Sequence, residues 1–596
     1  SREVRMPILN STLIIVACFL PLFFLSGMEG RMLIPLGIAF IVALFASTVV
    51  ALTLTPVLCS YMLTTKKALK KNEKEPFVSR TLKVWYKKAL EWALRHKKVV
   101  IGTSAALLIF TIIIMTGLGR SFLPPFNEGS LTINISTMPG ISLEESDNMG
   151  RMAEKILLDI PEIQTVARKT GRAELDEHAL GVNVSEMEAP FELDERSRDE
   201  FLADVRQRLG ELKGVNIEIG QPISHRIDAM LSGTKANIAI KLFGNDLNKL
   251  YNIGGQIKEA IQGIDGIADL TLEQQIERPQ LQIKLKRDML AKYGIPLPEF
   301  SEFINVALSG KVVSQVYEGG KVFDLTVKVH DDAKANMEQI GNLMIDANGQ
   351  KVPLHYVAEI LPLVGPNTIS RENVQRKIVV SANVAGRDLN GVVKDIQKTV
   401  GEQITLPEGY HVEYGGQFES EQAASRTLFL TSVISILLIF LLLFNEFHSM
   451  PLSSIIMLNL PLAIIGGILS IWFTSGIISI PAIIGFISLF GIATRNGILL
   501  VSHYNHLRSE GMSLHDSVVL GSLDRLNPIL MTALTSALAL IPLAVGGDLP
   551  GNEIQSPMAQ VILGGLLSST LLNGFVVPIM YLLLNHKQKE IENLEM

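Results

Sequence analysis

The stretch Ile477–Val501, IISIPAIIGFISLFGIATRNGILLV, constrains this chain more than any other. It is about as long and as apolar as a helix that crosses a lipid bilayer. It contains one full charge, Arg495, flanked by Thr494 and Asn496. A guanidinium keeps its proton, and its burial at that depth costs at least a few kcal/mol unless a partner compensates it. Two interpretations follow. Arg495 either pairs with a buried carboxylate inside a helix bundle, or snorkels over roughly 9 Å of helix to the membrane surface.

Seven further segments have the length and apolarity of membrane-spanning helices. None of them contains an Asp or Glu, so we expect the carboxylate partner of Arg495 to be encoded outside this sequence. The pattern predicts a polytopic α-helical membrane protein whose spans are Pro7–Gly27, Met32–Leu63, Val99–Gly119, Thr427–Phe444, Ser453–Phe473, Ile477–Val501, Asn527–Val545 and Ser556–Leu584.

Lysine and arginine gather on one side of these spans, and by the positive-inside rule that side is cytoplasmic. The loops 26–31 and 546–555 on the other side carry almost no positive charge. The cytoplasmic group comprises Arg2, Arg5, Lys66, Lys67, Lys70, Lys71, Lys74, Lys87, Lys88, Arg95, Lys97, Lys98, Arg508, Arg525 and Lys587.

The region 65–98 between the second and third spans contains an amphipathic pattern, Arg80–Arg95. Its apolar residues fall on one helical face, with lysines elsewhere. Trp85 and Trp92 favour a helix that lies in the cytoplasmic membrane interface. The alternative is an ordinary solvated linker helix.

The region between the third and fourth spans, about 300 residues long, is soluble in composition and lies outside the cytoplasm on this topology. Alternating apolar residues and helical periods recur along it as strand–helix–strand units, which are typical of ferredoxin-like α+β subdomains. Residues 287–363 interrupt the third unit and indicate an inserted subdomain. The predicted organisation is therefore 1–64 two membrane helices, 65–98 interfacial helix, 99–119 membrane helix, 120–286 α+β subdomains, 287–363 insertion, 364–425 return to the α+β unit, and 426–596 five membrane helices with a cytoplasmic tail.

Several chemistries find no support in the sequence. The net charge of −6 gives no reason to expect nucleic acid, and the two cysteines, Cys18 and Cys59, lie in apolar segments and form neither a disulfide framework nor a zinc motif. Walker A, Rossmann, HExxH and GxSxG patterns are absent from the sequence. A transporter driven by an ion gradient fits this combination better than an enzyme does. A protein-secretion subunit that uses the proton gradient is a second possibility.

Three membrane motifs carry a family resemblance. They are Leu54–Cys59 (LTPVLC), Ala493–Val501 (ATRNGILLV) and Arg525–Thr532 (RLNPILMT). With them the chain resembles the C-terminal part of a resistance–nodulation–division (RND) efflux permease, from the fifth to the twelfth membrane helix. The segments Asn127–Gly129, Met138–Ser142 and Arg226–Asp228 resemble the heavy-metal CusA/CzcA branch more than the multidrug branch.

The resemblance implies a bacterial inner-membrane exporter that works by proton antiport, with a large periplasmic region. It implies a homotrimer with a periplasmic adaptor and an outer-membrane channel, no cofactor, and the first four helices and first periplasmic half encoded outside this sequence. Arg495, Asn496 and Thr532 fall on the proton relay. Arginine stands where the family has lysine or glutamate, so it would tune carboxylate pKa values rather than carry the proton.

The substrate site is predicted by the same resemblance. The three methionines of copper and silver exporters fall here on Asn134, Glu186 and Ala229, none of which is Met. A register slip of one residue would bring in Met187 and Met230, whose alternative role is core packing. The carboxylates Glu186, Glu188 and Asp228 suit a divalent ion such as zinc or cobalt, unless they only form a solvated face. We therefore expect export of heavy-metal cations, with divalent ions favoured and a soft monovalent ion or an organic multidrug substrate as alternatives.

Overall fold

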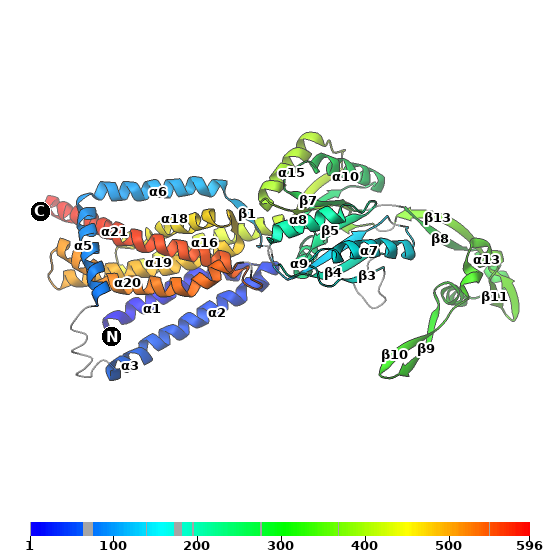
Figure 1. The fold of residues 1–596 in the computed structure, drawn as a ribbon, viewed down its shortest axis with the longest axis horizontal. Coiled ribbons are helices and arrows are strands. Elements are labelled where there is room, and N and C mark those ends of the chain that lie inside the picture. The colour runs from blue at the N-terminus through cyan, green and yellow to red at the C-terminus, as the bar shows by residue number, and fades with distance from the viewer. Residues whose placement is uncertain are drawn as a thin grey trace.

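A computed structural model describes residues 2–62, 76–124, 126–138, 140–171, 181–193, 196–273, 277–366, 369–547 and 549–595. Figure 1 shows three parts in a row: a helix bundle that holds both ends of the chain, two sheets with their helices, and an extended arm. Leu63, the lysines at 66, 67, 70, 71 and 74, and Pro139 lie outside the described residues.

Among the residues with described side chains, seven helices are long and apolar enough to cross a membrane, and an eighth, Leu9–Phe24, is apolar but shorter. The expected first span, Pro7–Gly27, differs at both ends, because helical structure runs from Arg2 through α1 and the following 3₁₀ turn to Phe24. The α-helix gives way to a 3₁₀ turn with Pro21 at its start, and the next helix begins at Gly27. The bundle helices are α1 (Arg2–Phe19), η1 (Leu20–Phe24), α2 (Gly27–Leu52), α3 (Leu54–Met62), α6 (Lys97–Gly117), α16 (Gln417–Phe447), α17 (Met450–Met457), α18 (Asn459–Phe473), α19 (Ile480–Ser509), α20 (Leu514–Val545) and α21 (Gln555–Glu595).

Two bundle helices begin ten or more residues earlier than expected. The helix α16 starts at Gln417 instead of Thr427, and α20 starts at Leu514 instead of Asn527. Ser513 caps α20, because its side chain accepts a hydrogen bond of 3.1 Å from the backbone N–H of Asp516. Charged residues interrupt both extensions, so an apolar-run criterion could not include them. The longer helices contain carboxylates that the expected spans left out, among them Glu29 in α2, Glu419, Glu421 and Glu446 in α16, and Asp516 and Asp524 in α20.

Small residues let bundle helices approach closely. At Gly466 of α18 and Gly564 of α21, an added Cβ would collide with the backbone carbonyl of the other glycine. The hydroxyl of Ser568 accepts from the N–H of Gly466 at 3.0 Å and donates to the carbonyl of Leu462 at 2.9 Å. Without a hydrophobic driving force between helices in lipid, such close packing and hydrogen bonding hold them together.

The helix α5 (Phe77–Arg95) lies against the bundle. Leu90, Ala93 and Leu94 are buried there, whereas Trp85 and Trp92 are exposed. Asn527 of α20 donates to the hydroxyl of Ser79 at 2.7 Å, and the Tyr86 hydroxyl donates to the carbonyl of Gly574 at 2.6 Å. One face of this amphipathic helix is thus fixed to α20 and α21.

The α+β region contains two sheets with the strand order of the ferredoxin-like fold. The first sheet has the order β3-β4-β2-β5, and the second contains β7-β15-β6-β16, with β14 at the end of β15. Each follows the chain order strand–helix–strand–strand–helix–strand, which confirms the expected fold class. The elements are β2 (Ser130–Ser136), α7 (Leu143–Leu158), β3 (Ala167–Thr170), β4 (Val184–Pro190), α8 (Arg198–Leu209), β5 (Asn216–Gly220), α9 (Pro222–Ser232), β6 (Ile238–Phe243), α10 (Leu247–Ile261), β7 (Ile267–Leu272), β14 (Arg371–Glu372), β15 (Gln375–Val384), α15 (Leu389–Gln403) and β16 (His411–Gly416).

Each sheet buries one face under two helices. In the first, α7 and α8 cover a core that includes Ile133, Met187 and Phe201. In the second, α10 and α15 cover a core that includes Ile240 and Val380. The opposite face of the first sheet is therefore free to carry polar side chains. A short parallel pair, β1 (Gly119–Ser121) with β17 (Ile477–Ser479), joins this region to the bundle.

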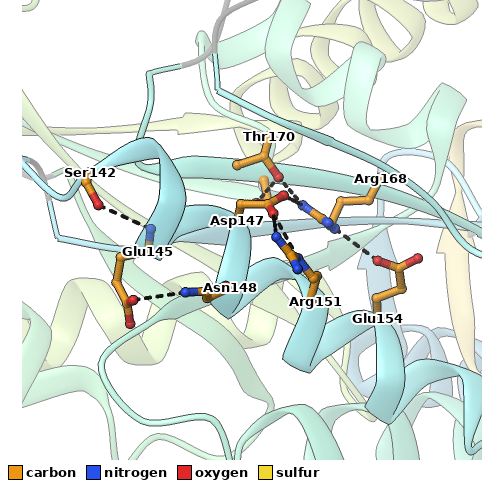
Figure 2. Close-up of polar contacts among 9 residues, drawn as sticks. Ser142, Glu145, Asp147, Asn148, Arg151, Glu154, Arg168 and Thr170 are labelled. Carbon is orange, nitrogen blue, oxygen red and sulfur yellow. Dashed lines mark hydrogen bonds and ion pairs between the residues drawn. The ribbon is translucent and has the colours of Figure 1, made fainter.

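An ion-pair cluster fastens α7 to its sheet (Figure 2). Arg168 of β3 reaches Asp147 at 2.7 Å and Glu154 at 3.1 Å, and Arg151 holds the other oxygen of Asp147 at 2.5 Å. Gly150 of α7 makes room for the Arg168 side chain, since a Cβ at position 150 would lie 2.9 Å from it. The hydrogen bond from Arg168, followed by that from Arg151, lowers the pKa of Asp147.

The inserted arm begins and ends with a two-stranded ribbon, in which β8 (Glu277–Leu285) pairs with β13 (Ala358–Pro366). The strand β8 thus belongs to the insertion and not to the α+β unit before it, and the expected start of the insertion at residue 287 is ten residues too late. Beyond the ribbon lie α11 (Arg287–Lys292), α12 (Leu297–Ile304), η2 (Asn305–Ser309), β9 (Lys311–Glu318), β10 (Lys321–Val327), η3 (Asp331–Lys334), α13 (Met337–Gly341), β11 (Met344–Ala347), β12 (Gln350–Pro353) and α14 (Leu354–Val357).

Candidate functional site

The polar face of the first sheet brings two of the predicted residues together. Asn134 of β2 lies directly opposite Glu186 of β4, and on its other side opposite Glu218 of β5. Because strand side chains alternate between faces, Met187 points the other way, into the core under α7 and α8. The strand register alone therefore separates the carboxylate of position 186 from the thioether of position 187.

Glu186 is held between two lysines. Lys169 lies 2.8 Å and Lys235 lies 2.6 Å from its carboxylate oxygens, and Lys235 also donates to Oδ1 of Asn134 at 3.2 Å. Burial alone would raise the pKa of Glu186, but the hydrogen bonds from the two lysines outweigh it and the pKa is lowered. The carboxylate of Glu186 is therefore ionised, and the ammonium groups of Lys169 and Lys235 already balance its negative charge.

His225 of α9 packs on the same face. Its ring lies over Gly220, where a Cβ would collide with Nε2, and its Nδ1 lies 3.5 Å from Nδ2 of Asn134. Nε2 has no hydrogen-bond partner among the described residues. Burial lowers the pKa of His225 to about 4, so the imidazole is neutral and its free nitrogen is a potential ligand. We call Asn134, Lys169, Glu186, His225 and Lys235 the Glu186 cluster.

Asp228 lies one turn after His225 but has different partners. Asn237 donates to Oδ2 at 3.1 Å and Gln417 donates to Oδ1 at 2.7 Å. The carboxyl group is buried, and this burial raises its pKa to about 6 despite the two amide donors. Asp228 therefore carries a proton-sensitive carboxyl group next to the first residue of α16.

The remaining predicted residues are separate from the Glu186 cluster. Met230 lies on α9 with 65% of its surface exposed, and Glu188 lies exposed on β4, two residues beyond Glu186. In the part of the chain with described side chains, no group of three or more His, Cys, Asp or Glu side chains is placed to hold a metal ion. A cation that binds Glu186 would first have to displace the lysine ammonium groups.

Sequence reasoning missed four members of this environment: Lys169, Lys235, His225 and Glu218. Glu218 is linked to the second sheet, because Thr271 of β7 donates to it at 3.0 Å, and burial raises its pKa. Asn134 and Glu186 were located by the resemblance, whereas the strand register shows that Lys169 and Glu218 lie on the same face. Lys235 is in a loop, and no periodicity locates it.

The membrane residues lie on α19 and α20. Arg495 is half-buried, and no described residue forms an ion pair or hydrogen bond with it. Asn496 is buried, with an Nδ2 that lacks a partner among the described residues, and Thr532 donates to the carbonyl of its own helix at Pro528, 2.8 Å away. The described residues therefore provide no carboxylate for Arg495.

A family model described as the AcrB/AcrD/AcrF family matches residues 1–585. The chain belongs to this family. It is a multi-pass membrane protein of the bacterial AcrB/AcrD/AcrF (RND) family with a large soluble α+β region, as the sequence predicts.

Relatives within the AcrB/AcrD/AcrF family are named for metals. The cobalt-zinc-cadmium resistance protein CzcA of Cupriavidus metallidurans is 33% identical over 100% of this chain and 56% of its own length. The nickel and cobalt resistance protein CnrA of the same species is 30% identical, over 97% of this chain and 54% of its own length. A crystal structure of a heavy metal efflux pump superimposes with a TM-score of 0.81 at 27% identity, covering 98% of this chain and 58% of that chain. The chain thus spans little more than half the length of these relatives.

Proposed function

We propose that this chain forms part of a proton-driven efflux permease that exports heavy-metal cations, with divalent ions as the preferred substrates. The observation that carries the proposal is the 33% identity to the cobalt-zinc-cadmium resistance protein CzcA across the whole chain. In this account the bundle lies in the bacterial inner membrane, and the α+β region stands in the periplasm, where it passes cations toward an outer-membrane channel.

The chemistry of the Glu186 cluster supports a divalent substrate. It offers a carboxylate and a neutral imidazole nitrogen, which suit zinc or cobalt, whereas soft monovalent ions prefer thioethers. Met187 lies in the core and Met230 lies exposed on α9, so these two do not form a thioether pair as folded. We propose that Lys169 and Lys235 occupy Glu186 between transport events and give way to the incoming cation, with Asp228, Glu188 and Asn134 as further candidate ligands.

Arg495, Asn496 and Thr532 support the coupling to protons. A guanidinium holds its charge through the cycle, so Arg495 would set the pKa of a neighbouring carboxylate without carrying the proton itself. We propose that this carboxylate comes from a segment outside the described residues.

The arm supports assembly into a larger complex. The antiparallel hairpin β9–β10 is exposed along both strands and carries apolar residues, with Val316 directly opposite Phe323. An exposed apolar hairpin of this kind is a surface for partners or an aggregation hazard. We propose that a second copy of the protein covers it in a homotrimer, which a periplasmic adaptor joins to the outer-membrane channel.

Deletion of the gene and complementation test the proposal. The deletion strain should become sensitive to zinc, cobalt or cadmium while its tolerance of silver, copper and cationic dyes stays unchanged, and the restored gene should reverse this. Sensitivity to dyes alone would favour a multidrug exporter. Unchanged tolerance of every metal, with the protein present in the membrane of the parent strain, would contradict the proposal.

A further inference from the structure

Where α5 packs on the bundle, it encloses a cavity of about 290 Å³ with walls from α5, α19, α20 and α21. This volume lies at the lower end of the range for small-molecule sites, about 300–1,000 Å³. Most of its lining is apolar. The cavity is separate from the Glu186 cluster, because its lining residues all belong to the bundle and to α5.

Three of the residues that line the cavity have buried polar atoms without partners among the described residues. Asn496 and Asn573 are 3% and 5% exposed. Nδ2 of Asn496, both amide atoms of Asn573 and the hydroxyl of Thr570 have no hydrogen-bond partner among the described residues. Leaving such a group buried and unpaired costs about 1–3 kcal/mol. Three residues in this state line one cavity, and a group bound there completes their hydrogen bonds once their side chains turn toward it.

The other polar groups of the lining are already satisfied. The Tyr86 hydroxyl donates to the Gly574 carbonyl at 2.6 Å, and the Ser522 hydroxyl lies 2.5 Å from the hydroxyl of Tyr504. The unpaired donors and acceptors therefore belong to Asn496, Thr570 and Asn573, which places the polar end of an occupant beside them.

The mouth of the cavity is apolar and opens outward. Leu82, Trp85 and Ala89 lie on one face of α5 and are exposed, as is Leu571 of α21. The helix α5 has the amphipathic pattern of a helix in the membrane interface, so lipid surrounds this mouth. A lipid chain can therefore leave the cavity without crossing a polar surface.

The occupant has an uncharged polar group. Among the described residues, no charged side chain lines the cavity, so an entering phosphate or carboxylate would lose its hydration without a compensating cation. The amide and hydroxyl groups of Asn496, Asn573 and Thr570 instead match a hydroxyl or ester group.

We propose that this cavity binds one neutral glycerolipid of the bilayer, a diacylglycerol or a lipid with the same uncharged end. Its hydroxyl or ester group bonds Asn573, Asn496 and Thr570, and an acyl chain leaves past Trp85 and Leu571. Because Asn496 adjoins Arg495 on α19, the lipid contacts the helical turn that carries the membrane charge.

Photo-crosslinking in lipid nanodiscs tests this site. The purified protein is reconstituted with trace diacylglycerol that bears a diazirine on one chain or, in a second arm, with phosphatidylglycerol that bears the same chain, and the labelled peptides are mapped. Diacylglycerol should label α5 around Trp85 and α21 around Leu571. Ala89→Phe, which places a ring in the mouth, should remove this labelling. Ala106→Phe, the same change on an exposed face of α6, should leave it intact.

Asn573→Leu separates a binding site from a packing defect. It should weaken labelling about tenfold through the loss of the polar contact. The same change should raise the melting temperature of the delipidated protein, because it removes an unpaired buried amide. Preferential labelling by phosphatidylglycerol would overturn the proposal. So would labelling spread evenly over the lipid-facing helices, or labelling that Ala89→Phe leaves unchanged, which would mean that water or another segment fills the cavity.

Discussion

Asp228 accepts a hydrogen bond of 2.7 Å from Gln417, a residue 189 positions away in the sequence. Asp228 lies on α9, against the polar face of the first sheet, and Gln417 is the first residue of α16, which runs into the bundle. The contact therefore joins the helix that carries His225 and Asp228 directly to a membrane helix. A change of charge at Asp228 would act at the end of α16.

The first prediction concerns the pH dependence of stability. Burial raises the pKa of Asp228 from its ordinary 3.8 to about 6. Between these values the folded protein retains a proton that the unfolded chain releases, so the free energy of unfolding falls as the pH rises. Above pH 6 the shift of this one pKa lowers the free energy of unfolding by about 3 kcal/mol relative to its value below pH 3.8. Asp228→Asn carries no charge and should melt at a higher temperature than the wild type at pH 7.5, and this advantage should shrink at pH 5.

Thermal unfolding in detergent with a metal chelator measures this difference. Asp332→Asn is the control, because the Asp332 side chain is exposed on the arm. A lower melting temperature of Asp228→Asn at both pH values would mean that the carboxylate stabilises the fold.

The second prediction concerns the cluster in Figure 2. The Arg168 side chain is 13% exposed and pairs with both Asp147 and Glu154, whereas Arg151 is 65% exposed and pairs with Asp147 alone. Arg168→Met should cost about 1–2 kcal/mol and speed hydrogen exchange in α7. Arg151→Met should change stability by no more than about 0.5 kcal/mol. Equal effects would contradict the view that Arg168 fastens the helix.

The third prediction concerns assembly. The combined change Val316→Ser and Phe323→Ser makes one cross-strand pair of the β9–β10 hairpin polar. Crosslinking should then recover single subunits while the protein stays folded, because every residue of both hairpin strands is exposed. The pair Gln315→Ser and Asp324→Ser, a polar cross-strand pair, is the matched control. Normal oligomers of the Val316/Phe323 variant would show that the hairpin is not a subunit contact.

The fourth prediction concerns the membrane charge. Arg495→Ala should abolish metal export while the protein still inserts, because the neighbouring carboxylate loses the charge that lowers its pKa. Arg495→Lys should keep much of the activity, since it keeps the charge. Metal efflux from preloaded cells measures both. Normal export by Arg495→Ala would support the snorkelling interpretation.

The sequence predicts the fold class well because its signals are local. Alternation and helical periods identify the strand–helix–strand units, and long apolar runs identify the bundle. The polar start of α16 at Gln417 contains no apolar run, so hydropathy placed the helix ten residues late. The strand β8 alternates like any other strand, and nothing in that pattern shows that it pairs with β13 instead of joining the second sheet.

The candidate site was only partly predictable for a similar reason. Strand alternation is enough to place Asn134 and Glu186 on one face. The two lysines that occupy Glu186 come from a neighbouring strand and a distant loop, so the pairing depends on tertiary structure. The lack of a hydrogen-bond partner for Nε2 of His225 likewise depends on how α9 packs over Gly220.

Resistance profiles of three single variants test the central claim most directly. Cells with Glu186→Gln should lose zinc and cobalt resistance more than cells with Met187→Leu or Met230→Leu. The volume-conserving change at buried Met187 should cost less than about 1.5 kcal/mol and leave the fold intact. Equal protein levels in the membrane are checked for all three. The reverse order, with the methionine variants most impaired and silver or copper resistance most affected, would contradict a divalent-cation site at Glu186.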